Sequence, residues 1–130
     1  MRFSKTVFLI ACIYGMLVLA PGYFGEKRIG AQFPPAITHP EFYYGFLGVA
    51  MAWQVAFLII ARDPLRFRAI IPAAILEKLG YALATAGLFA TGRLNPMLAA
   101  SGVGDLLFAI LFTICYMRLG KPSAQAAAGR

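Results

Sequence analysis

Three charged residues stand inside otherwise apolar segments: Glu77, Lys78 and Asp105. The first two interrupt the stretch Ala69–Gly92. A helix that crosses a bilayer needs about 20 mainly apolar residues, and this stretch is long enough for one. A charge at the centre of such a helix costs roughly 2.5–3.5 kcal/mol on insertion scales, so it is rarely left without a partner. Ionisable side chains at this depth commonly belong to ligand sites or proton paths. We therefore expect the chemistry of this chain around these three residues.

The positions of the three residues along their helices predict which of them pair. At 1.5 Å rise per residue, all three lie about 18–24 Å from the turn near Arg93. That short turn makes the two helices antiparallel neighbours, so Lys78 and Asp105 are expected to form an ion pair. Glu77 and Lys78 are adjacent in sequence, and their side chains diverge by about 100° around the helix. Glu77 then needs a proton, a water-filled space or a hydrogen bond, for which the Tyr81 hydroxyl, one turn on, is a candidate donor.

Two further side chains at membrane depth, Gln54 and Trp53, are candidates for the same site. The Trp53 ring is expected to pack between helices more readily than to line a cofactor cavity. One interpretation of the site is structural, with a Lys–Asp bridge that fixes helix register, although polar contacts in membranes are worth only about 0.6 kcal/mol on average. A second is functional, with a ligand pocket or a proton path. In a third, Glu77 or Lys78 faces another subunit.

The composition favours an integral membrane protein. Of the 130 residues, 61% are hydrophobic and 13% charged, whereas soluble domains average about 45–50% apolar and about 25% charged residues. The net charge of +7 comes from short basic clusters between apolar segments, which indicates membrane topology and not a nucleic-acid partner. Cys12 and Cys115 lie inside apolar segments, so neither a disulfide nor a metal site is expected. No phosphate-binding, nucleophile or haem motif is present in the sequence, and no cofactor is expected.

Four apolar segments predict an all-α fold, an antiparallel four-helix transmembrane bundle. The segments are residues 6–21, 42–61, 69–91 and 97–117. They form a single four-span membrane domain over residues 1–118. The small and polar residues 119–130 are expected to form a flexible cytoplasmic tail.

The Lys and Arg residues of the short loops predict the orientation of the bundle. One side holds Arg2, Lys5, Arg62, Arg66, Arg68, Arg118, Lys121 and Arg130. The other side holds Lys27, Arg28 and Arg93. Because cytoplasmic loops are enriched in Lys and Arg, both termini are predicted to be cytoplasmic. The basic turn of Arg62, Arg66 and Arg68 either determines this topology alone or also binds anionic lipid headgroups.

On the opposite side, His39 and Glu41 precede the second span. One His and one Glu do not make a metal site, so an interfacial capping and hydrogen-bonding role is expected. The preceding connection, Tyr23–Pro40, contains three prolines and is not expected to form a long regular helix. It is either a plain tether or a lid over the outer end of the bundle.

Three runs of sequence resemble those of known membrane proteins. They are YYGFLGVAMAWQVAFLIIARDPLRFR (Tyr43–Arg68), EKLGYALA (Glu77–Ala84) and GVGDLL (Gly102–Leu107). In these runs the chain resembles a group of small uncharacterised bacterial inner-membrane proteins with four spans. In span count and length it is also similar to the DoxX-like proteins. The resemblance implies a four-helix protein of the bacterial inner (cytoplasmic) membrane and brings no assigned activity.

These observations favour a non-catalytic membrane protein with a polar site at mid-membrane depth. That site, formed by Glu77, Lys78, Asp105, Tyr81 and Gln54, is expected to bind a small lipophilic ligand or to stabilise helix assembly. One alternative is an accessory subunit of a larger membrane complex. Another is a lipid- or quinone-modifying enzyme with Glu77 and Asp105 as acid and base. The expected partners are the lipid bilayer, a small lipophilic ligand and other membrane subunits.

Overall fold

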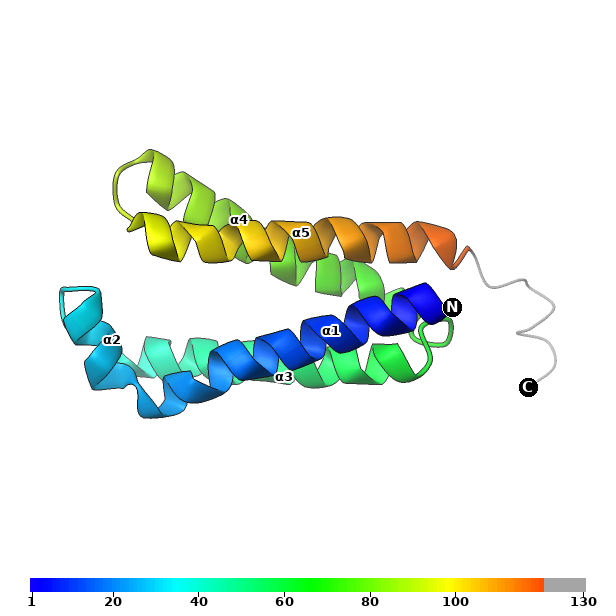
Figure 1. Cartoon of the computed structure of the whole chain (residues 1–130), viewed down its shortest axis with the longest axis horizontal. Coiled ribbons are helices and arrows are strands. Elements are labelled where there is room, and N and C mark those ends of the chain that lie inside the picture. Colours follow the sequence, from blue (N-terminus) through cyan, green and yellow to red (C-terminus); the bar gives the residue numbers. More distant parts are fainter. Residues whose placement is uncertain (121–130) are drawn as a thin grey trace.

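The computed structural model describes residues 1–120, and four long helices dominate them (Figure 1). These are α1 (Arg2–Leu19), α3 (Pro40–Arg62), α4 (Ile71–Ala90) and α5 (Pro96–Arg118). Three short helices complete the fold: η1 (Ala20–Phe24), α2 (Glu26–Gln32) and η2 (Arg68–Ile70). Successive long helices run in opposite directions, and residues 1–120 contain no strand. The prediction of an all-α fold with four antiparallel helices is confirmed.

Four helical stretches of 23 residues each are long and apolar enough to cross a membrane. They are Arg2–Phe24, Pro40–Arg62, Arg68–Ala90 and Pro96–Arg118. At 1.5 Å per residue each spans about 34 Å, slightly more than the roughly 30 Å hydrocarbon core of a bilayer. Each predicted span overlaps one of these stretches over nearly its whole length. The chain is thus a multi-pass membrane protein.

Apart from Leu119 and Gly120, the predicted tail lies outside the described residues.

Local sequence signals explain where the long helices begin and end. Pro40 and Pro96 stand in the first turns of α3 and α5, where a missing N–H costs nothing. Asn95 caps α5, because its side-chain oxygen accepts a hydrogen bond of 2.8 Å from the backbone N–H of Met97. After α3, the Asp63 carboxylate accepts a bond of 3.1 Å from the backbone N–H of Arg66. This bond holds the turn that reverses the chain.

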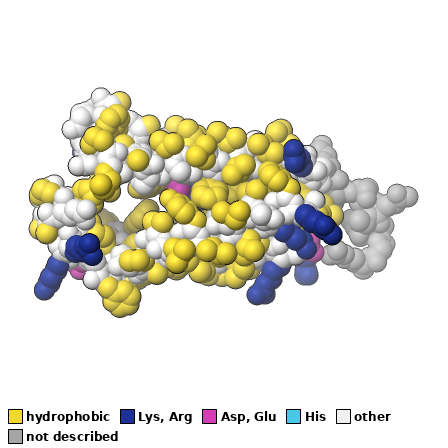
Figure 2. Space-filling view, in the orientation of Figure 1, with side chains coloured by type: hydrophobic (Ala, Val, Ile, Leu, Met, Phe, Trp, Pro, Cys, Tyr) yellow, Lys and Arg dark blue, Asp and Glu magenta, His cyan; other side chains and the backbone are white. Residues whose placement is uncertain are grey.

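The helices form two pairs, α1 with α3 and α4 with α5, which converge at one end (Figure 1). We call this end the basic end, because it holds Arg2, Lys5, Arg62, Arg66, Arg68 and Arg118. The opposite end, with η1, α2 and the turn at residues 91–95, is the loop end. Figure 2 shows the Lys and Arg side chains gathered at these two ends, with an apolar surface between them. This distribution matches a bundle whose middle lies in hydrocarbon.

An aromatic core joins the two pairs in the half of the bundle nearer the basic end. The side chains of Phe8, Phe57 and Phe112, from α1, α3 and α5, are fully buried. The Phe8 and Phe112 rings stack at 4.3 Å between centroids, and the Phe57 ring meets Phe112 edge-on at 5.1 Å. Close packing therefore fills this half of the bundle.

Two glycines allow the helices within each pair to approach closely. A Cβ on Gly15 of α1 would overlap the side-chain amide of Gln54 on α3. A Cβ on Gly102 of α5 would overlap the hydroxyl of Thr85 on α4. Small residues at such contacts are the usual means by which membrane helices pack, since no hydrophobic effect drives them together in lipid.

The connection between α1 and α3 is folded onto α3. The Tyr43 hydroxyl donates to the backbone oxygen of Gly22 at 2.6 Å, and the Tyr44 hydroxyl donates to the Glu26 carboxylate at 2.9 Å. As expected, this proline-containing connection has no long helix, and α2 is only seven residues long. The two tyrosines fix it to one helix pair, and a lid role stays a prediction.

Candidate functional site

A cavity of about 130 Å³ lies between the two helix pairs. All four long helices line it: Tyr14, Gly15, Val18 and Leu19 from α1, Phe46, Ala50 and Gln54 from α3, Glu77, Lys78 and Tyr81 from α4, and Ser101 and Asp105 from α5. In Figure 2 the molecule is hollowed between the pairs toward the loop end, and an acidic side chain is visible near the hollow. The cavity has room for several water molecules or for a small polar headgroup.

A charged cluster of Glu77, Lys78 and Asp105 lies at the cavity. The Lys78 ammonium is 3.2 Å from a carboxylate oxygen of Asp105 and 3.4 Å from one of Glu77. The side chains of Lys78, Asp105 and Glu77 are only 9%, 16% and 17% exposed. The predicted Lys78–Asp105 ion pair is confirmed. The expectation that Glu77 and Lys78 do not face each other is wrong, because the flexible four-carbon Lys stem brings the ammonium back toward its neighbour.

The Lys78 ammonium also rests near the aromatic core. It lies 5.4 Å from the centroid of the Phe57 ring, within the range of a cation–π attraction. Phe57 is fully buried and belongs to the packed half of the bundle. The charged cluster therefore marks the boundary between the closed half and the cavity.

Tyr81 binds Ser101 across the α4–α5 interface instead of Glu77. The two hydroxyl oxygens are 2.8 Å apart, and the Ser101 hydroxyl donates to the backbone oxygen of Leu98 at 2.6 Å. Since the Ser101 proton is used in that way, Tyr81 donates and Ser101 accepts. The predicted bond from Tyr81 to Glu77 is therefore wrong, because the Tyr81 side chain extends from α4 toward α5 and its hydroxyl binds Ser101 there.

Two buried oxygens at the cavity lack a hydrogen-bond partner among residues 1–120: Gln54 Oε1 and Glu77 Oε2. Gln54 is 1% exposed, and its Nε2 donates to the backbone oxygen of Ala50 at 2.9 Å. Its Oε1 lies instead against Gly15. Glu77 Oε2 faces the Lys78 ammonium at 3.4 Å without hydrogen-bond geometry. Unpaired buried acceptors are costly. Gln54 Oε1 is packed against α1, whereas the Glu77 carboxylate lines the cavity and can accept a further hydrogen bond there.

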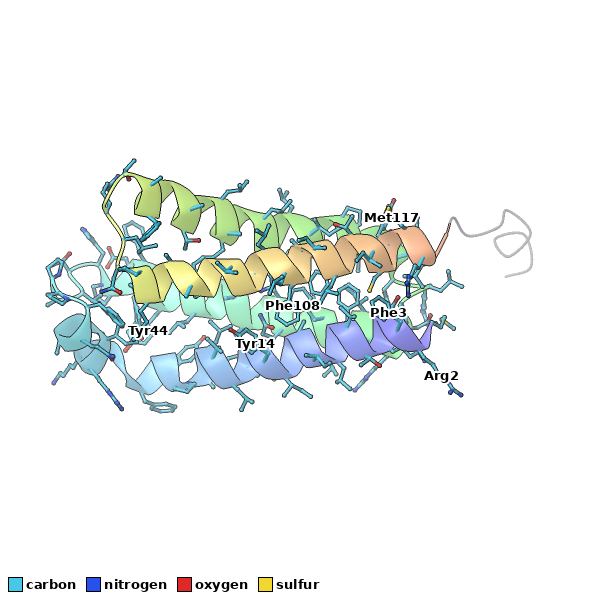
Figure 3. The ribbon with its side chains drawn as sticks, turned by 45° about the horizontal axis from the view of Figure 1, so that its top comes forward. Arg2, Phe3, Tyr14, Tyr44, Phe108 and Met117 are labelled. Atoms are coloured by element: carbon cyan, nitrogen blue, oxygen red, sulfur yellow. The ribbon has the colours of Figure 1, made fainter. Side chains whose placement is uncertain are left out.

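Aromatic pairs stand at both interfaces between the helix pairs. Phe46 of α3 and Tyr81 of α4 stack at 5.9 Å between ring centroids. Tyr14 of α1 and Phe108 of α5 approach to 5.6 Å, and Figure 3 shows them facing each other across the gap between these helices. Phe46 and Tyr14 remain about half exposed. The cavity thus has aromatic walls that are in part accessible from the sides of the bundle.

The sequence-predicted site residues are mostly brought together. Gln54, Glu77, Lys78, Tyr81 and Asp105 all line the cavity. The Trp53 side chain points elsewhere: it packs against the aromatic core, with its ring 6.1 Å from that of Phe57. This position agrees with the sequence-based expectation that the Trp53 ring packs between helices.

The sequence prediction omitted the apolar lining. Phe46, Ala50 and Gln54 recur every four residues on α3, and Tyr14 and Val18 do so on α1. Residues four apart share a helix face. The spacing is therefore a signal in the sequence. Once Gln54 is assigned to the cavity, Phe46 and Ala50 follow as lining residues on the same face of α3, and Val18 follows from Tyr14 on α1.

The remaining candidate residues lie at the two ends of the bundle. At the loop end, the exposed ring of His39 is 3.1 Å from the Glu41 carboxylate, in agreement with a hydrogen-bonding role. The expected capping role is wrong for the side chain, because His39 stands at the N-cap of α3 and its ring makes no capping hydrogen bond. At the basic end, Arg68 donates to the backbone oxygen of Tyr116 at 3.3 Å, and its guanidinium stacks on that ring at 3.8 Å. The side chains of Arg62 and Arg66 stay exposed. A lipid-headgroup role for these three arginines stays a prediction.

Comparisons of the chain with protein-family models, with curated proteins and with solved structures found no match. The function is therefore inferred from the chemistry of the cavity, since a helical bundle by itself does not imply an activity.

Proposed function

We propose that this chain is a bacterial inner-membrane protein that binds a small lipophilic molecule in the cavity between its helix pairs. One observation supports the proposal above the others. The charged cluster is placed beside open space, which all four long helices line, and not inside a closed helix interface. An ion pair that served only to fix helix register would gain from close packing and would need no cavity.

The walls of the cavity define the kind of molecule. Glu77, Lys78 and Asp105 supply a polar end at mid-bundle, and Val18, Leu19 and Phe46 supply an apolar side toward the loop end. Ligand sites usually combine such apolar walls with a few convergent polar groups. A molecule with a small polar group and an apolar remainder fits both parts.

The charge distribution supports an orientation with both termini in the cytoplasm. The basic end holds Arg2, Lys5, Arg62, Arg66, Arg68 and Arg118, whereas the loop end holds Lys27, Arg28 and Arg93. Cytoplasmic ends of membrane proteins carry the excess of Lys and Arg. In this orientation the cavity faces the outer half of the inner membrane.

Helix assembly is the second role that an observation favours. Lys78–Asp105 and Tyr81–Ser101 both connect α4 with α5. These contacts stabilise one helix pair and leave the space between the pairs open, so this role is compatible with ligand binding. The accessory-subunit and enzyme alternatives stay predictions.

Replacement of Ala50 by Leu is expected to abolish ligand retention and to leave the fold intact. Ala50 is buried on the cavity wall, and three additional carbon atoms there occupy the space for a ligand. Ala52→Leu is the matched control, because Ala52 is exposed on the same helix. The measurement is mass spectrometry of small molecules retained through purification in a mild non-ionic detergent. Equal retention by both variants, or no retained molecule in the unmodified protein, would contradict the proposal.

A further inference from the structure

The charged cluster contains one positive and two negative side chains. We propose that the cavity selects an amphiphile with a positively charged amino group, which supplies the missing positive charge. This inference rests on the proposed function and names the class of its ligand. The amino group would meet Glu77, and the apolar chain would lie along the open side of the cavity.

The charge count is the first support. Lys78 lies within 3.4 Å of carboxylate oxygens of both Glu77 and Asp105. Among residues 1–120, no other Lys or Arg lines the cavity. With all three groups ionised, the cluster has a net charge of −1 at mid-bundle depth, where hydrocarbon surrounds the helices. Such a charge is unfavourable unless a proton or a cation compensates it.

The unpaired acceptors are the second and independent support. Gln54 lines the cavity and is 99% buried, and its Oε1, which lies against Gly15, has no hydrogen-bond partner among residues 1–120. Glu77 Oε2 also has none, and the cation near it, the Lys78 ammonium at 3.4 Å, is shared with Asp105, to which it donates at 3.2 Å. An ammonium group is a donor of up to three hydrogen bonds and has no acceptor. Glu77 lines the cavity, where its carboxylate can accept a hydrogen bond from such a group.

The aromatic walls are the third support. Tyr14, Phe46 and Tyr81 line the cavity, and ring faces attract cations. The protein already uses this attraction within the charged cluster, where the Lys78 ammonium lies 5.4 Å from the centroid of the Phe57 ring. Tyr14, Val18 and Phe46 are about half exposed, so an alkyl chain seated there remains in contact with the surrounding lipid. The site therefore suits a ligand that enters sideways from the bilayer.

Three probes with the same alkyl chain test the proposal on the full-length protein in nanodiscs of zwitterionic lipid. The probes are dodecylammonium, 1-dodecanol and dodecanoate, each below its micellar concentration, and binding is followed by native mass spectrometry and by the thermal unfolding temperature. Because a charge-assisted hydrogen bond is stronger than one from a neutral hydroxyl, the amine is expected to bind about tenfold more tightly than the alcohol. Dodecanoate is expected to bind weakest.

Variants assign the preference to the cavity. Glu77→Gln is expected to remove the advantage of the amine over the alcohol and to leave alcohol binding unchanged. Glu41→Gln is the matched control, because the Glu41 carboxylate is exposed at the loop end, and it should keep the full advantage. Should Glu77→Gln not fold, Ala50→Leu tests the same site without any change of charge, and it should block amine binding.

Three other outcomes overturn the proposal. If amine and alcohol bind equally well and Ala50→Leu blocks both, the cavity binds a ligand but a proton alone balances the charge. If none of the probes binds, the proposed function fails together with this inference. If Glu77→Gln and Ala50→Leu both keep the amine preference, the amine binds to the lipid surface and not to the cavity.

Discussion

Replacement of Lys78 by Met is expected to lower the free energy of unfolding by about 3–5 kcal/mol, the cost of removing one partner from a buried ion pair. Lys78 is the only cation beside Glu77 and Asp105 among the residues that line the cavity. Its loss leaves two largely buried carboxylates close together with no positive partner. Met has a similar length and volume, so the effect reports the lost charge and not a lost contact.

A second set of variants isolates the electrostatic origin of that effect. In the triple variant Lys78→Met, Glu77→Gln and Asp105→Asn, no charge remains in the cluster, and the stability is expected to return close to that of the unmodified protein. Asp105→Asn alone leaves Lys78 paired with Glu77 and should cost less than Lys78→Met. Lys27→Met, at the exposed loop end, is the control and should change little.

Thermal unfolding in non-ionic detergent, followed by circular dichroism, measures these differences. A Lys78→Met variant as stable as the control would show that the cluster is not shielded from water. An unchanged stability of Asp105→Asn would refute the structural role of the bridge between α4 and α5.

Replacement of Gly102 by Ala is expected to lower the free energy of unfolding by about 1–3 kcal/mol, the usual cost of overpacking a filled interface. The added Cβ would overlap the Thr85 hydroxyl. That hydroxyl donates to the backbone oxygens of Tyr81 and Ala82 at 3.0 Å, which limits its ability to move away. The helices α4 and α5 must therefore separate, and the Tyr81–Ser101 bond is strained with them.

Gly87→Ala is the matched control for this substitution. Gly87 lies on α4, and a Cβ there meets nothing within 4 Å. Ala favours a helix over Gly by about 1 kcal/mol, so the control should be neutral or stabilising. The double variant Gly102→Ala with Thr85→Ala should recover most of the lost stability, because the overlapping hydroxyl is gone. Equal effects of Gly102→Ala and Gly87→Ala on thermal unfolding would show that α4 and α5 do not pack as described.

The sequence predicts the long helices and part of the site for clear physical reasons. Runs of apolar residues bounded by Pro40, Arg62 and Pro96 leave few choices for where a membrane helix begins and ends. Lys78 and Asp105 pair because the short turn between their helices places them at nearly the same depth. Depth along a helix follows from counting residues, and one turn constrains only two helices.

Other features depend on how the helices rotate and tilt, which no single segment determines. The Gly15–Gln54 contact joins α1 to α3 across a long connection. The space between the pairs exists because they diverge toward the loop end (Figure 1). Tyr81 binds Ser101 and not Glu77 because of the rotamer of the Tyr81 side chain and the position of α5. Sequence spacing restricts such choices to one helix face but does not select the partner.

Water in the cavity can be detected directly by cysteine labelling. Ser101→Cys and Val103→Cys are placed one at a time on α5 in a protein whose two buried cysteines, Cys12 and Cys115, are replaced by Ala. Ser101 lines the cavity, whereas Val103 lies two residues away, is 58% exposed and faces the surrounding lipid. Only an ionised thiolate reacts with a charged thiosulfonate reagent, and this ionisation requires water. Rapid labelling of Ser101→Cys and little labelling of Val103→Cys are expected in nanodiscs, and equal or reversed labelling would contradict a water-accessible cavity between the helix pairs.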